Sequence, residues 1–213
     1  MMMLIMIVTG CGSEKKDSKE LIDPNASSLT LQVDEIIDDR YVVQIPQFIS
    51  EINSETINDI NYDIDNLLVD MYERLSESKD KTPEIRLITS ESEKYLQVVA
   101  MYVDYPLVGS DGDVVSYNYV RDEDIRLYMS DALIRAGITL DDLKNKIIEE
   151  YYLINEEIAD NITVHGATVD GFIIEENDVI FYGNINVSEE DIDHWSYIFE
   201  YSFNEEKLRI IEE

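Results

Sequence analysis

The chain has 213 residues and an ordinary globular composition, with 45% apolar residues, but an unusual charge. Its 47 acidic residues outnumber 16 basic ones, which gives a formal net charge of −31 at pH 7. Such a surface repels nucleic acid and anionic lipid headgroups, and it attracts cations, cationic peptides and basic proteins. Nucleic acid is therefore excluded as a partner. The plainer interpretation, that acidity keeps an exported protein soluble, is favoured by the even spread of acidic residues.

An apolar run at the start of the chain ends at its only cysteine, Cys11. The run, a Thr-Gly pair and the cysteine are typical of the end of a secretion signal. Val8-Thr9-Gly10-Cys11 resembles the lipobox of bacterial lipoproteins, in which diacylglycerol is added to the cysteine thiol and cleavage makes that cysteine the new N-terminus. Residues 1–10 are thus predicted to be a signal peptide, and Cys11 to carry the lipid that holds the protein on the extracytoplasmic side of the cell membrane.

Two features of this run leave alternatives open. No Lys or Arg precedes it, although a signal normally begins with a positive region, so we expect that the true start codon lies upstream of Met1. The structural alternative is a buried N-terminal strand, which Gly10-Cys11-Gly12 and the charged segment after it would end abruptly. The run is far shorter than the roughly 20 residues that a membrane-spanning helix needs.

The rest of the chain predicts a tether over residues 11–28 and a single extracytoplasmic α+β domain over residues 29–213. Alternation predicts strands over residues 29–33 and 40–45, the second ended by Pro46. Apolar residues at steps of three and four predict a helix capped by Asn53 or Ser54. These apolar residues are Ile57, Ile60, Ile64, Leu67, Leu68, Met71 and Leu75.

Three strands, two helices and four strands are expected to follow. The strands are residues 84–89, 95–105 and 114–121, then 171–175, 178–182, 196–203 and 207–211. The helices are residues 130–136, with Gly137 as C-cap, and a longer one capped by Thr139. Glu176-Asn177 is a tight-turn candidate. The fold class is therefore α+β, a largely antiparallel sheet with helices packed on one face.

This order of elements resembles the extracytoplasmic domains of unknown function found in lysozyme-sensing anti-sigma factors and ahead of some Gram-positive peptidoglycan deacetylase domains. The matching segments are Ile45-Pro46-Gln47, Ile60-Asn61, residues 95–105, 109–112, Tyr117-Asn118, residues 125–133 and 171–182. Two segments depart from the family: the turn Gly-Ser-Asp-Gly-Asp lacks the usual His, and residues 192–196 replace a Pro-Tyr-Gly segment. The resemblance implies an α+β domain that senses or binds, with no catalytic residue to carry over.

Few residues suggest catalysis. His165 and His194 lie far apart, without companions at metal-ligand spacing, and are interpreted as loop residues. No Gly-x-Ser-x-Gly elbow or phosphate-binding glycine loop occurs. A pair of carboxylates acting as in glycosidases stays open, because an acidic chain offers many such pairs.

Two weaker site hypotheses remain. Asp111 and Asp113 flank Gly112 in a tight turn, where oxygen ligands could bind calcium at extracellular concentrations, although a solvated turn is the plainer interpretation. Tyr102, Tyr117 and Trp195 could line a binding face, although strand tyrosines more often pack half-buried on a sheet.

The function expected from the sequence is that of a surface-anchored, non-catalytic binding or sensing module that faces the cell wall. Its expected partners are the membrane, through the lipid, and a cationic protein or a cell-wall component. A wall-active hydrolase with paired carboxylates and a calcium-dependent structural lipoprotein are the alternatives. Apart from calcium, no cofactor is expected.

Overall fold

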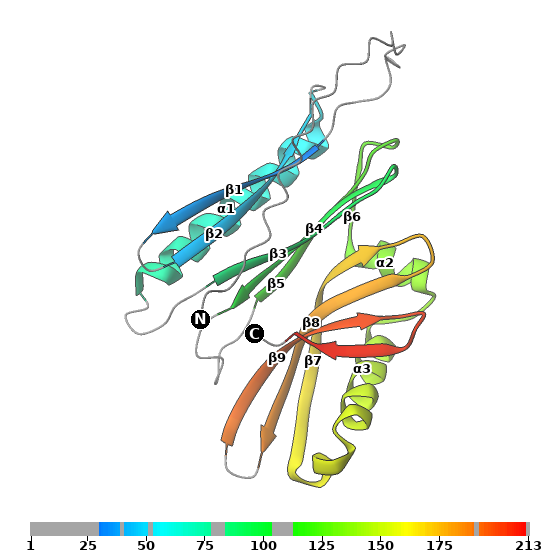
Figure 1. The fold of residues 1–213 in the computed structure, drawn as a ribbon. Coiled ribbons are helices and arrows are strands. Elements are labelled where there is room, and N and C mark those ends of the chain that lie inside the picture. Colours follow the sequence, from blue (N-terminus) through cyan, green and yellow to red (C-terminus); the bar gives the residue numbers. More distant parts are fainter. Residues whose placement is uncertain are drawn as a thin grey trace, which may run out of the picture.

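A computed structural model describes residues 30–38, 41–50, 53–77, 84–103, 113–189 and 192–211, and these form two β-sheets with helices on their outer faces (Figure 1). The first sheet has six strands in the order β1-β2-β3-β4-β5-β6. They are β1 Thr30–Asp38, β2 Tyr41–Ile49, β3 Glu84–Glu91, β4 Tyr95–Val103, β5 Asp113–Val120 and β6 Ile125–Leu127. All neighbours in it are antiparallel except β2 and β3.

The second sheet has four antiparallel strands in the order β10-β9-β8-β7. They are β7 Ile162–Ile174, β8 Val179–Glu189, β9 Ile192–Ser202 and β10 Lys207–Ile210. The helices are α1 Glu55–Glu77, α2 Met129–Ala136, α3 Leu140–Ile154 and the short 3-10 helix η1 Glu156–Asn161. The α+β class and the largely antiparallel pairing are as predicted. The division of the strands between two sheets was not foreseen.

The elements stack in four layers (Figure 1). Helix α1 covers one face of the six-stranded sheet, and the other face packs against the four-stranded sheet through Val99, Met101 and Val114. Helices α2 and α3 cover the far face of the four-stranded sheet with Ala132, Leu143, Ile147 and Tyr151, a core that also takes in Phe172, Phe181 and Phe199. Each sheet therefore has both faces at least partly covered.

Helix α1 forms where the apolar spacing predicts it. Ser54 is its N-cap, because the hydroxyl accepts a hydrogen bond from the Ile57 N–H at 3.1 Å. Ile57, Ile60 and Ile64 lie buried against the sheet. The predicted side-chain positions Leu68, Met71 and Leu75 lie outside the described side chains.

Strand β2 does not end at Pro46 as predicted but continues to Ile49. Phe48 donates its N–H to the Asn61 side chain of α1, so this N–H does not point toward β1. Every second residue of β2 points its backbone N–H in the same direction as Phe48. Pro46 lies two residues before Phe48 and is the register partner of Val33. Because a backbone N–H at position 46 would also point away from β1, proline removes no hydrogen bond between β1 and β2.

Strand β7 starts at Ile162, nine residues before the predicted start at 171. Two register shifts, between Val164 and Gly166 and between Val169 and Gly171, interrupt the alternation that predicts strands. At the second shift Thr168 approaches β8 so closely that a Cβ on Gly183 would lie 2.0 Å from the Thr168 carbonyl oxygen. Only glycine fits there. Strand β8 runs to Glu189, seven residues past its predicted end, and β9 starts at Ile192, four residues before its predicted start. Strand β10 lies close to its predicted position, and Glu176-Asn177 forms the tight turn between β7 and β8.

The sheets are joined at the free edge of β7. The Gln97 side chain of β4 is 1% exposed and pairs with the backbone of Ile174, accepting its N–H at 2.7 Å and donating to its carbonyl at 2.9 Å. Ser116 of β5 accepts the N–H of Phe172 at 3.2 Å. Side chains of the first sheet thus take the place of a neighbouring strand for β7.

Helix α2 ends and helix α3 begins where the sequence indicates. Gly137 ends α2 with φ 68°, and Thr139 caps α3 by accepting the Asp142 N–H at 3.1 Å. Among the described residues, no helix combines the length and apolar character needed to cross a bilayer.

Candidate functional site

The residues predicted to form sites are only partly described. Cys11 and Asp111 lie outside the described residues. Asp113 begins β5 opposite Tyr102, but its side chain is not among those described. The lipidation and calcium hypotheses therefore stay predictions. Within the described part of the chain, no group of three or more His, Cys, Asp or Glu side chains is placed to hold a metal ion.

The hypothesis of an aromatic binding face needs correction. Tyr102 and Tyr117 are buried in the core beneath α1, because both point from the six-stranded sheet toward the helix. They pack inside the sheet–helix layer and cannot present their rings to a ligand. Trp195 lies on β9, opposite Val187 of β8, in the other sheet.

The histidines are on strands and not in the predicted loops. His165 lies on β7, exposed, with its Nε2 2.8 Å from the Ser188 hydroxyl of β8. His194 lies on β9. His165 bonds across the strand pair in the way of an ordinary surface residue.

Two hollows on the surface are the candidate sites. The first, here called the α1–β6 groove, has a volume of about 450 Å³. It lies between α1, the β5–β6 turn and the segment after β6. Its lining residues are Thr56, Asp59, Tyr62, Asp63, Asp124, Ile125, Arg126 and Tyr128. Tyr62 is 67% exposed and Tyr128 58%, so both present aromatic surface to a partner.

Asp124 fixes the β5–β6 turn to the start of α1. Its φ of 51° is a left-handed backbone conformation that Asp tolerates better than most residues. Its carboxylate accepts hydrogen bonds from the Ser54 hydroxyl at 2.5 Å and the Tyr119 hydroxyl at 2.8 Å. Its carbonyl accepts the Thr56 hydroxyl at 2.8 Å. The groove therefore has one rigid end.

Arg126 holds the middle of the groove. Its guanidinium pairs with Asp63 of α1 and lies 5.6 Å from the ring centroid of Tyr117 and 5.3 Å from that of Tyr128. Asp59, one helical turn before Asp63, forms no ion pair or hydrogen bond with any described residue. The groove thus offers an unpaired carboxylate beside exposed aromatic rings.

The buried tyrosines beneath the groove stay protonated. Burial raises the pKa of Tyr117 to about 12, with the Asp63 charge adding to the rise and Arg126 opposing it. Burial also raises the pKa of Tyr119 to about 12, and the bond to Asp124 adds to it. At neutral pH these hydroxyls act as hydrogen-bond donors and carry no charge.

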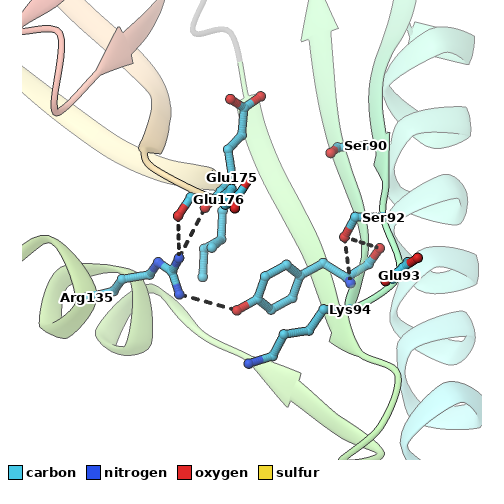
Figure 2. A pocket seen from close by; sticks show the side chains of 9 residues that line it. Ser90, Ser92, Glu93, Lys94, Arg135, Glu175 and Glu176 are labelled. Carbon is cyan, nitrogen blue, oxygen red and sulfur yellow. Dashed lines mark hydrogen bonds between the residues drawn. The ribbon is translucent and has the colours of Figure 1, made fainter.

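The second hollow, here called the β4–α2 pocket, has a volume of about 700 Å³ (Figure 2). Three segments far apart in sequence meet there: the β3–β4 turn, the last turn of α2 and the β7–β8 turn. Its lining residues are Ser90, Ser92, Glu93, Lys94, Tyr95, Arg135, Ile174, Glu175 and Glu176. Tyr95 and Ile174 are buried and form an apolar floor.

Arg135 connects two walls of this pocket. Its guanidinium donates to the Tyr95 hydroxyl at 3.3 Å and to the backbone carbonyls of Glu175 at 3.1 Å and Glu176 at 3.3 Å. Figure 2 shows it reaching in from α2, with Ser90, Ser92 and Glu93 on the opposite side. Ser92 closes the β3–β4 turn by accepting the Tyr95 N–H at 2.9 Å.

Sequence reasoning did not find either hollow. Each draws its lining from segments that are joined only by strand pairing and helix packing, such as residues 90–95 with Arg135 and Glu175. The sequence gives one hint of the β4–α2 pocket, because Arg135 and Lys94 are among only 16 basic residues in a strongly acidic chain. The exposure of Tyr62, on the polar face of the α1 pattern, was a second signal.

No family model matches the chain, and no curated protein matches it either. The resemblance to the extracytoplasmic domains described above stays a prediction.

Proposed function

We propose that the chain is a lipid-anchored, extracytoplasmic binding or sensing module that recognises a cationic protein or peptide at the cell wall. The observation that carries the proposal is the α1–β6 groove, where exposed Tyr62 and Tyr128 lie beside the unpaired carboxylate of Asp59. Aromatic faces next to carboxylates bind ammonium and guanidinium groups through cation–π contacts and ion pairs.

The charge of the whole chain supports the same partner. A net charge of −31 draws a basic protein toward the surface and speeds its association, while short-range contacts decide where it docks. The groove supplies such contacts, because Arg126 and Asp124 hold its walls in place before a partner arrives. Preformed walls lower the entropy cost of binding.

The lipobox-like segment supports the location. A lipid on Cys11 would hold the domain at the membrane surface, and residues 11–28 would place it at a distance from the anionic headgroups that its charge repels. The module would then face the wall.

Binding can be tested with purified full-length protein and lysozyme as the cationic probe, at physiological ionic strength. We expect the wild type to retain lysozyme more strongly than an equally acidic control protein. The double variant Tyr62→Ser with Tyr128→Ser should lose most of this excess. The matched control is Ile134→Ser with Leu153→Ser, which removes two side chains that are 79% and 65% exposed on α2 and α3.

Equal retention by both double variants would show that charge alone attracts the probe, and it would refute the groove. Wall fragments in place of lysozyme form a second arm of the experiment. Enrichment of neither probe over the acidic control would count against the whole proposal.

The anchor has a separate test. Cys11→Ser should abolish labelling by a fatty-acid analogue and release the protein from membranes. Retention of the variant on membranes would refute the lipid anchor and leave the groove untouched.

A further inference from the structure

The β4–α2 pocket contains two cations that no carboxylate neutralises. Arg135 bonds only to neutral acceptors, a phenol and two backbone carbonyls. Lys94 lies over the Tyr95 ring, 5.4 Å from its centroid, and has no ion pair with a described residue. Elsewhere in the described part, Arg121, Arg126, Lys146 and Arg209 each pair with a carboxylate.

Carboxylates are nevertheless close at hand in this pocket. Glu93, Glu175 and Glu176 line the same hollow and are exposed, yet none of them forms an ion pair with Lys94 or Arg135. Cationic and anionic side chains thus line one pocket without forming ion pairs with each other. A ligand that carries a positive and a negative charge can form ion pairs with both kinds of side chain.

Arg135 is already held in place for such a ligand. The helix end at Gly137 fixes the last turn of α2, and the guanidinium is anchored to both the β4 and the β7–β8 walls. Guanidinium has five N–H donors in a planar fork, and the three bonds described leave some of them for an added acceptor. The ordering cost that a flexible arginine would add to binding is therefore small.

We propose that the β4–α2 pocket binds a small zwitterion, a free amino acid or a short peptide with free ends. The carboxylate lies between Arg135 and Lys94, and the ammonium group faces Glu175 and Glu176. The carbon skeleton rests on Tyr95 and Ile174. A pocket of about 700 Å³ is within the range for small-molecule sites. The pocket is distinct from the α1–β6 groove, and this proposal does not depend on the groove or on the lipid.

The test uses full-length protein and calorimetric or NMR titration with three probes: the dipeptide alanyl-alanine, its N-acetyl derivative and its C-terminal amide. The free dipeptide should bind in the millimolar range or tighter, and each blocked form should bind roughly tenfold more weakly or worse, since each lacks one charged contact. Equal binding of the acetylated and free forms would refute the zwitterion assignment. Absence of binding by all three probes would refute the site.

Variants then locate the binding. Lys94→Gln and Arg135→Gln should each weaken the dipeptide roughly tenfold, while Lys207→Gln, an exposed lysine on β10, should change nothing. Lys94 is the decisive position, because its ammonium makes no hydrogen bond that supports the fold. Unchanged affinity in Lys94→Gln, with the melting temperature of the wild type, would overturn the proposal even if Arg135→Gln is destabilised.

Discussion

The two helix-covered faces of this molecule are built in different ways. The face beneath α1 combines a stripe of isoleucines with the hydroxyl-bearing side chains Tyr102, Tyr117 and Tyr119. Helix α1 is tied down by polar bonds at several points, including both bonds of Asn61 to the Phe48 backbone, each 2.9 Å long. The core beneath α2 and α3 also contains three buried tyrosines, but among eighteen described buried residues rather than nine, so apolar side chains such as Phe181 and Phe199 make up most of it.

The two layers should therefore lose stability under different changes. Apolar burial is insensitive to pH and is weakened by cavities. Hydrogen bonds between specific groups are weakened when a partner is deleted or ionised, because the remaining group stays buried without a partner. The face beneath α1 is also where the groove lies, so its polar bonds hold both the helix and the proposed binding surface.

The largest effect is expected in the apolar core. Phe181→Ala should lower the free energy of unfolding by roughly 3 to 5 kcal/mol, because the lost ring leaves a cavity between β8 and the helices. Urea unfolding at neutral pH measures it. Ile134→Ala, at a highly exposed position on α2, is the control and should change little. A loss no larger than that of the control would mean that this face does not depend on apolar volume.

Alkaline pH should act on the face beneath α1. An ordinary tyrosine has a pKa of about 10, whereas Tyr117 and Tyr119 are raised to about 12. Their raised pKa means that the folded state favours the protonated form. The stability they contribute is fully present below pH 10 and is lost as pH rises toward 12.

The measurement is unfolding by circular dichroism against pH, with tyrosinate absorbance recorded in parallel. The double variant Tyr117→Phe with Tyr119→Phe should unfold at a higher pH than the wild type. Burial also raises the pKa of Tyr201 in the other core, so Tyr201→Phe is the matched control for where the alkaline transition begins. A larger shift from Tyr201→Phe would reverse the comparison between the two faces.

Two carboxamides give a closer comparison. Gln97 and Asn61 each pair with both backbone groups of one residue, but Gln97 is fully buried and Asn61 half-exposed. Gln97→Leu should cost roughly 2 to 4 kcal/mol, because it leaves the N–H and carbonyl of Ile174 buried without partners. Asn61→Leu should cost less, since water can reach the freed groups. Equal losses in urea unfolding would contradict burial as the cause.

Local sequence patterns correctly predicted the elements that follow a single regular periodicity or a standard capping preference. Helix α1, Gly137 and Thr139 follow directly from spacing and capping preferences, and Ser54 is one of the two caps that the sequence offered for α1. The early part of β7 escapes the prediction because two bulges shift its alternation, and β2 continues past Pro46 because the missing N–H of Pro46 faces away from β1. Periodicity carries no information on either exception.

The candidate sites could not be predicted, for a different reason. The partition of strands between two sheets depends on long-range pairing, and that partition brings Lys94, Arg135 and Glu175 together. The tyrosines proposed for a binding face, Tyr102 and Tyr117, are of a residue type that suits such a face, but their side chains lie on the side of the sheet that α1 covers. Alternation says that Tyr102 and its neighbour on the strand point to opposite faces, and it does not say which face a helix will cover.

The smallest effect is expected at the turn that holds one end of the groove. Asp124→Gly keeps the left-handed backbone, since glycine adopts φ of 51° without strain, but removes the carboxylate that Ser54 and Tyr119 share. It should cost about 1 to 2 kcal/mol. Asp124→Ala should cost more, because it loses the same bonds and adds backbone strain of roughly 1 kcal/mol. Urea unfolding of both variants separates the two contributions. If Asp124→Gly is as stable as the wild type, the polar bonds do not hold α1, and the contrast between the two faces would reduce to their apolar volumes.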